Sequence, residues 1–351
     1  MIRPAVLAGW LTAVAWPAAA FAQTGWGIGV QPNGGIVFCD RARGTVWRID
    51  ADGHRSAVAA GVTCRAVVPD PDGSVRGESI PGDVTTALGA GVWQIDSSGA
   101  MQWVTPPTHA PAPDIWLIRD ALGRTYSWTG SGAGSARSEI LQRDETGATM
   151  VLAGSEWGQR DGVGAMASFG NVAGFALAPD GSIVVADSGN IRRVSPLQNV
   201  QTEARGVVTN SRVGLINTPG LWGRELGVAT DGTGAAVVVD SAAGRIVRVG
   251  RDGQVTPIWE PARLAQRVSG GRWGWRPAGV AVLGSTYYVL DEWMGPALLA
   301  DLIGSPRLSQ VDRNGRVTRI ATVPDWTVRA AAAALGFIVA SLLWARRQRG
   351  S

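Results

Sequence analysis

Four aspartates follow short apolar runs at equivalent places along the chain, and their carboxylates are the clearest candidates for chemistry. They are Asp40, Asp187, Asp240 and Asp291. If these positions meet at one rim of a closed ring, the carboxylates and the amide oxygen of Asn190 could hold a hard cation such as calcium. The alternative interpretation is that each aspartate accepts backbone N–H groups of its own turn. The turn role is favoured for Asp187, because Asp187-Ser188-Gly189-Asn190 is a complete turn sequence by itself.

Asp291 differs from the other three aspartates, because Glu292 and Trp293 follow it in place of a tight turn. Aromatic and guanidinium side chains stand at the start of the same unit and of the unit before it. At a rim they could bind a peptide, a glycan or a carboxylate. The predicted ligand-binding residues are Trp222, Arg272, Trp273, Trp275, Arg276, Asp291 and Glu292. Packing between sheets is the alternative role, and it is favoured for most tryptophans of the chain.

Most catalytic arrangements lack a necessary residue in this sequence. The two histidines, His54 and His109, stand in turn or loop sequences, and there is no lysine. Histidine-based lyase chemistry, a zinc site and a lysine Schiff base are therefore disfavoured. Neither a Gly-x-Ser-x-Gly elbow with a usable histidine nor a phosphate-binding glycine loop is present. The residues present favour a binding protein over an enzyme.

The elements that would position these residues form a repeat. Short runs rich in Val, Ile, Trp and Ala alternate with Asp-Gly, Asn-Gly or Ser-Gly turns, which is typical of successive β-hairpins. One series of turn glycines recurs at Gly53, Gly99, Gly147, Gly253 and Gly315. One member of this series is disguised near residues 196–199. A period of about fifty residues with four strands in each unit predicts a β-propeller.

The fold class predicted is all-β, a six-bladed β-propeller. Its units are placed at 26–60, 61–106, 113–154, 169–207, 220–260 and 274–324. Because the second and third units are degenerate, five or seven blades also fit the pattern. Many glycines and prolines, without a Gly-X-Y period, agree with short strands joined by turns and exclude collagen.

One unit resembles a known family. The segment 161–194 contains Asp161-Gly162-Val163-Gly164-Ala165, then Gly174-Phe175-Ala176-Leu177-Ala178, then Val185-Ala186-Asp187-Ser188-Gly189-Asn190, and it is similar to an NHL repeat. Val172 stands where the family favours proline, and the Asn190-Ile191 junction is one residue short. The resemblance implies a propeller used mainly for binding. It also implies relatives that became lactonases, lyases or amidating lyases, so a calcium-assisted, lactonase-like hydrolase is the alternative function.

The two cysteines, Cys39 and Cys64, are 25 residues apart. In the repeat register Cys39 ends the second strand of the first unit and Cys64 begins the first strand of the second unit. These positions lie near the same rim, so the sequence predicts a disulfide between neighbouring blades.

The two ends of the chain predict export and anchoring. Residues 1–22 have a basic start, an apolar run and a small-residue cleavage pattern, as in a secretory signal peptide. Residues 326–345 are apolar between two tryptophans and predict a transmembrane helix, with a buried core helix and a processed sorting tail as alternatives. The arginines of 346–351 place that tail in the cytoplasm. The predicted location is therefore the bacterial inner membrane, with one span and the propeller of residues 23–325 in the periplasm or outside.

The charge of the chain argues against nucleic acid as a partner. The net charge of +4 comes from arginines in the end segments, and the exported body is near neutral. No basic stripe of the kind that binds DNA or RNA remains. The sequence thus predicts a binding or scaffolding module for an envelope protein, peptide or glycan, without a cofactor unless calcium binds.

Overall fold

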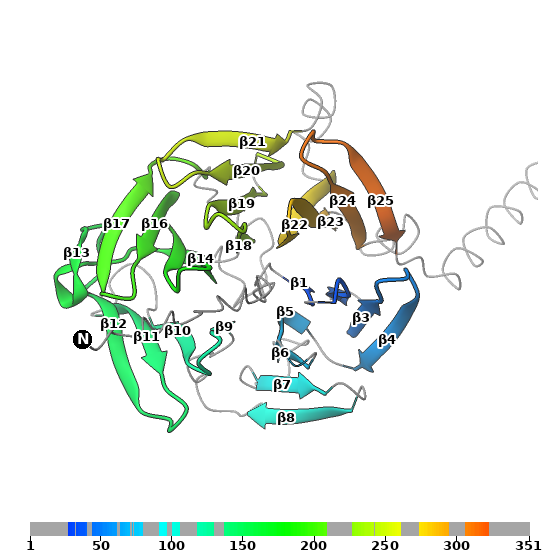
Figure 1. The fold of residues 1–351 in the computed structure, drawn as a ribbon, viewed down its shortest axis with the longest axis horizontal. Helices are drawn as coiled ribbons and strands as arrows, with labels where there is room; N and C mark the ends of the chain where they lie inside the picture. Colours follow the sequence, from blue (N-terminus) through cyan, green and yellow to red (C-terminus); the bar gives the residue numbers. More distant parts are fainter. Residues whose placement is uncertain are drawn as a thin grey trace, which may run out of the picture.

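The computed structural model describes residues 27–31, 33–40, 44–61, 64–70, 72, 74–79, 91–96, 100–105, 118–129, 137–208, 227–241, 243–260, 274–294 and 306–322. These residues form six antiparallel sheets that follow one another along the chain. Figure 1 shows the sheets arranged as blades around a common centre, with the innermost strands being β1, β5, β9, β14, β18 and β22. The fold is an all-β, six-bladed propeller, as the sequence predicts.

The first three blades have four strands each. Blade 1 contains β1 (Ile28–Val30), β2 (Ile36–Asp40), β3 (Thr45–Ile49) and β4 (Arg55–Ala60). Blade 2 contains β5 (Cys64–Pro69), β6 (Val75–Ser79), β7 (Gly91–Ile95) and β8 (Met101–Thr105). Blade 3 contains β9 (Ile118–Arg119), β10 (Thr125–Thr129), β11 (Ser138–Arg143) and β12 (Thr149–Ser155).

Blade 4 is the exception, because a fifth strand is added at its outer edge. Its strands are β13 (Gly162–Val163), β14 (Val172–Leu177), β15 (Ile183–Asp187), β16 (Asn190–Val194) and β17 (Asn199–Ala204), with a short 3-10 helix, η1 (Gly164–Met166), after β13. Blade 5 contains β18 (Val228–Thr230), β19 (Ala236–Asp240), β20 (Arg245–Val249) and β21 (Val255–Trp259). Blade 6 contains β22 (Gly274–Leu283), β23 (Thr286–Met294), β24 (Arg307–Val311) and β25 (Val317–Thr322).

Each predicted unit contains the four principal strands of one blade, except that β12 ends at Ser155, one residue beyond the third unit. The fourth unit was predicted to begin too late, because β13 pairs with β17 and extends that blade back to Gly162. The disguised turn lies where the sequence predicts it. Gln198 adopts a φ of 66°, in the left-handed region that Gly53, Gly147 and Gly253 occupy in other blades. A non-glycine residue at that position explains why the turn is hard to recognise.

Apolar side chains alternate along the strands and pack between neighbouring blades. At the junction of blades 6 and 1, for example, Ile28 and Phe38 pack against Leu290 and Leu308, and all four are almost completely buried. Each such side chain contributes about 1.5 to 3 kcal/mol when it is buried. Blade 1 contains only strands from the start of the described chain, and blade 6 only strands from its end. The ring is therefore closed by this apolar contact, because no sheet contains strands from both ends.

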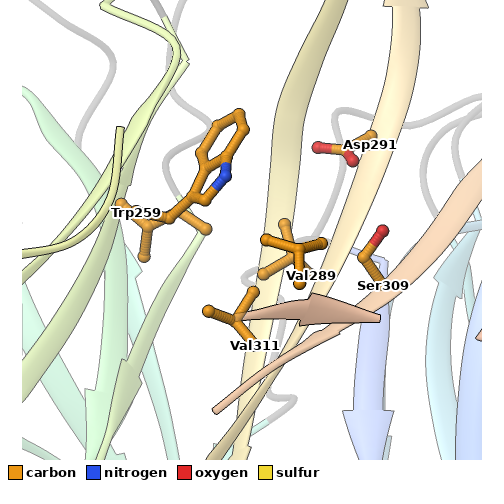
Figure 2. Close-up of a pocket in the computed structure, with 7 residues that line it drawn as sticks. Trp259, Val289, Asp291, Ser309 and Val311 are labelled. Atoms are coloured by element: carbon orange, nitrogen blue, oxygen red, sulfur yellow. The ribbon is translucent and has the colours of Figure 1, made fainter. Parts of the chain in front are cut away.

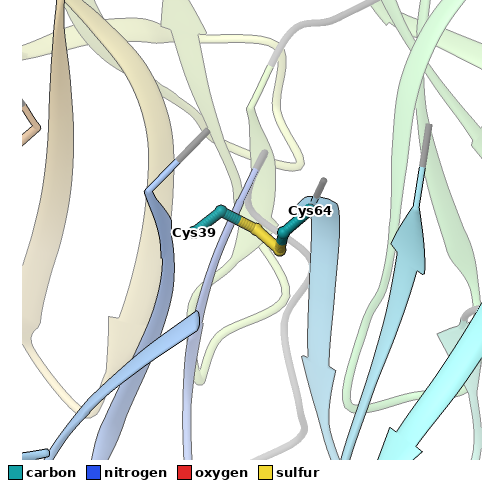
Figure 3. Close-up of a disulfide and its surroundings, with 2 residues drawn as sticks. All are labelled: Cys39 and Cys64. Atoms are coloured by element: carbon teal, nitrogen blue, oxygen red, sulfur yellow. A yellow bond between two sulfur atoms is a disulfide. The ribbon is translucent and has the colours of Figure 1, made fainter. Parts of the chain in front are cut away.

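A disulfide joins Cys39 of β2 to Cys64 of β5, with the two Cα atoms 5.5 Å apart. Figure 3 shows the bond crossing from blade 1 to blade 2 at one end of these strands. Both cysteines are completely buried in the apolar contact between the two blades. The bond therefore ties two neighbouring sheets together, as the repeat register predicts.

The predicted signal peptide and transmembrane helix lie outside the described residues. Within the part of the chain that the structure describes, no helix is long and apolar enough to cross a bilayer.

Candidate ligand-binding site

The four equivalent aspartates point between blades and not into the central channel. Asp187 lies on the same face of its strand as Ile183 and Val185, which pack against blade 3. Asp40 shares its face with Phe38, which packs against blade 6. Successive side chains project to the two faces of a sheet. In a radial blade these two faces are directed at the neighbouring blades. Equivalent carboxylates therefore lie in different corners, where a corner is the space between two neighbouring blades.

The hydrogen-bonding partners of the Asp187 carboxylate all belong to its own blade. Its side chain is 0 % exposed. One carboxylate oxygen accepts the N–H of Gly170 at 2.9 Å and the hydroxyl of Ser188 at 3.0 Å. The other accepts Nη1 of Arg192 at 2.8 Å. Burial raises the pKa of Asp187, while Arg192 and these hydrogen bonds act in the opposite direction. The carboxylate therefore closes a turn and a buried ion pair.

Asn190, the predicted amide ligand, is also engaged. Its Nδ2 donates to Oε1 of Gln159 at 3.1 Å, and its Oδ1 accepts the N–H of Gly206 at 3.1 Å. The turn before it has two residues, Ser188 and Gly189, whose positive φ angles of 52° and 87° are typical of a tight hairpin. The amide oxygen thus holds neighbouring segments in place.

Asp240 is likewise buried against its own loop. It accepts the N–H of Ala243 at 3.1 Å and pairs with Nε of Arg245 at 3.3 Å. Arg245 then donates from Nη2 to the carbonyl of Val207, which belongs to the preceding blade. Asp40 is also 0 % exposed. Among the described residues, no three histidines, cysteines or acidic residues lie close enough together to hold a metal ion.

Asp291 occupies the equivalent corner between blades 5 and 6, and there the carboxylate lines a pocket. The cavity is small, with a volume of about 20 Å³, which is room for about one water molecule. Its lining residues are Ile246, Trp259, Val289, Asp291, Ser309, Val311 and Val317. Figure 2 shows the Asp291 carboxylate and the Ser309 hydroxyl on the blade 6 side, with the Trp259 indole across from them. Two neighbouring blades thus supply a polar wall and an aromatic wall.

Strand register builds the polar wall. Asp291 pairs with Arg307, Val289 pairs with Ser309, and Ser309 pairs in turn with Arg319. Directly paired residues share a face of the sheet, so these polar side chains lie on the side that faces blade 5. Tyr287, Val289 and Val311 on the same face pack with Val239 and Ile246 of blade 5. The polar group therefore lies beside an apolar contact.

Burial shifts the pKa values of the charged groups in this corner. Burial raises the pKa of Asp291 to about 6, although the positive charges of Arg307 and Arg319 act to lower it. Burial and the neighbouring charge of Arg319 lower the pKa of Arg307 to about 10. A largely buried carboxylate beside a partly buried guanidinium, both poorly solvated, is an arrangement often found at functional sites.

The structure places one predicted ligand-binding residue, Asp291, in this pocket. Glu292 and Trp275 lie in the paired strands β23 and β22, as does Arg276, while Trp222, Arg272 and Trp273 lie outside the described residues. His54, predicted to be a solvated turn residue, is exposed in the turn after β3. Sequence reasoning missed Trp259 and Ser309, which come from different units. The available signal was a serine in the strand sequence Leu308-Ser309-Gln310-Val311, two residues before a valine and therefore on the same face of the strand.

Comparison with known proteins assigns no family to this chain. No family model matches the chain, and no curated protein matches it in sequence. The resemblance of residues 161–194 to an NHL repeat therefore stays a prediction.

Several solved structures are similar in arrangement. Virginiamycin B lyase from Staphylococcus aureus is 14% identical with a TM-score of 0.45, covering 86% of this chain and 84% of its own. A streptogramin B lyase is 10% identical with a TM-score of 0.47, covering 89% and 85%. A Bacteroides caccae protein of unknown function is 13% identical with a TM-score of 0.47, covering 88% and 95%. Values this low transfer no activity to this chain.

Proposed function

We propose that this chain is a membrane-anchored, extracytoplasmic propeller that binds a protein, peptide or glycan of the cell envelope in the corner between blades 5 and 6. The observation that carries the proposal is that equivalent aspartates have different surroundings. Asp187 and Asp240 are completely buried and bonded to arginines of their own blades. Asp291 instead lines a pocket that two blades share.

The chemistry of the pocket supports binding. Its walls are mostly aliphatic, with one carboxylate and one hydroxyl facing an indole. A ligand that reaches both walls would also bridge two blades. We also propose that residues 161–194 are an NHL repeat. That assignment would agree with a propeller used for binding.

Site-specific photocrosslinking tests the binding site in the intact, membrane-anchored protein. A photoreactive phenylalanine derivative replaces Val317, which lines the pocket and is 46% exposed. The control replaces Val255, the first residue of β21, as Val317 is the first residue of β25. Val255 is 45% exposed and is not part of the pocket lining. We expect illumination of growing cells to give an adduct with an envelope molecule at position 317 only. No adduct there, or equal adducts at both positions, contradicts the proposal.

The anchor is tested by cell fractionation. The full chain should stay with membranes after an alkaline wash, and a chain ending before Trp326 should be released in soluble form. Release of the full chain by the same wash would contradict membrane anchoring through residues 326–345.

A further inference from the structure

Apolar side chains fill the junctions between neighbouring blades, with one exception among the described residues. Buried clusters lie between blades 1 and 2, 3 and 4, 4 and 5, 5 and 6, and 6 and 1. Blades 2 and 3 are neighbours in the ring (Figure 1), yet their described residues form no such cluster with one another. The faces that meet at this junction therefore differ from the others.

One equivalent position shows this difference directly. The middle residue of strands β2, β15 and β19 faces the preceding blade, and it is apolar in all three: Phe38, Val185 and Val238. The equivalent strand of blade 3 is β10, whose middle residue is Ser127. A polar residue thus stands where blades 1, 4 and 5 place an apolar one.

The side chain of Ser127 is buried at the junction of blades 2 and 3. Tyr126 and Ile140 pack against blade 4. Because side chains alternate along a strand, Ser127 and its cross-strand neighbour Leu141 lie on the opposite face, towards blade 2. Ser127 is 0 % exposed, and its hydroxyl has no hydrogen-bond partner among the described residues. A hydroxyl buried in this way destabilises the closed junction.

The face of blade 2 that is directed at blade 3 is also polar. Trp93 packs against blade 1, so the next residue, Gln94, and its cross-strand neighbour Arg76 lie on the other face. Arg76 donates from Nε and Nη2 to the carboxylate of Asp70, at 2.7 Å in each case. Val68 completes this row and is buried, but it belongs to none of the apolar clusters that the described residues form. The ion pair of Arg76 and Asp70 therefore stabilises blade 2 itself.

Charge attraction acts between blades 2 and 3 at the surface. Arg119 of blade 3 is exposed, and so is Asp72 in the turn between β5 and β6. Hydrogen bonds from Ser74 lower the pKa of Asp72, and the positive charge of Arg119 lowers it further. Attraction between exposed charges contributes little to stability. It therefore does not replace the apolar contact that the other junctions have.

The disulfide lies on the opposite side of blade 2. Cys39 and Cys64 belong to the apolar cluster between blades 1 and 2, and the bond joins the two sheets there. Blade 2 is thus held to blade 1 by a covalent bond and an apolar cluster, while it faces blade 3 with polar groups. Regions with few buried apolar contacts open at the lowest free energy.

We infer that the propeller opens at the junction of blades 2 and 3, and that the bond between Cys39 and Cys64 keeps blade 2 on blade 1 when it does. The inference does not depend on the ligand proposed above. Opening at this junction brings polar faces into water, whereas opening at another junction would expose one of the apolar clusters. Without the bond, blade 2 should separate from both of its neighbours.

The reactivity of a buried thiol measures this opening in the full chain, held in a non-ionic detergent. Ser127→Cys places a thiol at the junction of blades 2 and 3. The matched control, Val238→Cys, places one at the equivalent point of blade 5, inside the cluster between blades 4 and 5. Both positions are 0 % exposed, so N-ethylmaleimide reaches either thiol only after an opening. We expect position 127 to react more than about tenfold faster than position 238, since a local opening needs less free energy than global unfolding.

The effect of urea on these rates identifies the kind of opening. Opening one junction exposes little surface, so the rate at position 127 should rise weakly with urea, while the rate at position 238 should follow global unfolding and rise steeply. Val68→Cys probes the same junction from blade 2 and should behave like Ser127→Cys, which keeps the test valid if one variant does not fold. Equal rates or equal urea responses at the junction and control positions would overturn the inference.

The role of the disulfide is tested with a thiol at Val67, which is 0 % exposed in the cluster between blades 1 and 2. In the oxidised chain, Val67→Cys should react as slowly as Val238→Cys. When Cys39→Ala and Cys64→Ala are added to both variants, position 67 should become the faster of the two by about tenfold, because blade 2 can then leave blade 1. Equal rates at positions 67 and 238 without the bond would overturn the role assigned to the disulfide.

Discussion

Asp187 and Arg192 are both completely buried, and their charged groups lie 2.8 Å apart in blade 4. The guanidinium of Arg192 also donates to the carbonyls of Ser168 and Arg160 and to the carboxylate of Asp161. It stacks over the ring of Phe169, with 4.8 Å between Cζ and the ring centroid. One arginine thus fastens the segment before β14 to strands β15 and β16. In this segment the charged residues have a structural role.

Replacement of Arg192 by methionine should strongly destabilise the protein. It leaves the Asp187 carboxylate buried without its partner, and breaking such a pair typically costs 3 to 5 kcal/mol. Denaturant unfolding of the full chain measures the change. The control is Arg251→Met, which breaks the exposed pair between Arg251 and Asp180; pairs of that kind contribute about 0 to 1 kcal/mol. Equal losses in the two variants would contradict the structural role of Arg192.

The disulfide should stabilise the ring where blade 1 meets blade 2. The two cysteines are separated by 25 residues, and a loop of that size corresponds to roughly 3 kcal/mol in the loop-closure model. The double variant Cys39→Ala, Cys64→Ala should melt several degrees lower than the oxidised chain, and a reductant should no longer affect its melting temperature. Non-reducing mass analysis of the native chain should give a linked peptide pair. Two free thiols would contradict the bond.

Much of the fold is predictable from the sequence because each blade is built from local hairpins with their own turn chemistry. Gly53, Gly147 and Gly253 all have positive φ at equivalent turns, so their spacing reports the blade period directly. The positions of the candidate site are harder to predict. Asp291 was found because it departs from the turn pattern, but its partners Trp259 and Ser309 come from separate blades. Their meeting depends on how two sheets pack, which a hydrophobic pattern does not specify.

The direction of the carboxylates bears on the two roles that the sequence left open for them. One was convergence at one rim around a hard cation, and the other, favoured for Asp187, was the closing of each residue's own turn. Strand geometry instead sends each side chain toward the neighbouring blade, so Asp40 faces blade 6 and Asp240 faces blade 4. Rotational symmetry then keeps these carboxylates apart.

Calcium should leave the melting temperature of the full chain unchanged. The carboxylate of Asp187 is already saturated with hydrogen bonds, and that of Asp240 is paired with Arg245. A true site would stabilise the fold by about 2.7 kcal/mol when the ion is at 100 times its dissociation constant. Thermal unfolding with excess calcium and with a chelator measures the difference. A rise of several degrees with calcium would restore the metal site and with it the hydrolase alternative.

Gly77 should not tolerate a side chain. It pairs across the sheet with Trp93, and a Cβ added at Gly77 would lie 1.9 Å from Cζ2 of Trp93. Trp93 is completely buried beside the disulfide, so it cannot move aside, and such overpacking costs about 1 to 3 kcal/mol. Gly77→Ala should therefore lower the unfolding free energy by that amount. Gly232→Ala, where no atom lies within 4 Å, is the control and should change little.

Replacement of Asp291 by asparagine should stabilise the fold at alkaline pH. Burial raises the pKa of Asp291 to about 6, above its value in the unfolded chain. The folded state therefore holds a proton more tightly, and the stability associated with this proton is present at low pH and lost as the pH rises through about 6. An asparagine does not titrate, so the variant should be more stable than the original chain at pH 8, and this advantage should disappear near pH 4.

Melting temperatures of both chains across this pH range measure the effect, and Asp312→Asn, in an exposed turn after β24, controls for a general change in charge. A residue kept at a position where it destabilises the fold is expected at a binding site. If the difference between the two chains does not depend on pH, or if asparagine destabilises the fold at pH 8, the carboxylate of Asp291 serves stability, and the reason for assigning it to a ligand is lost.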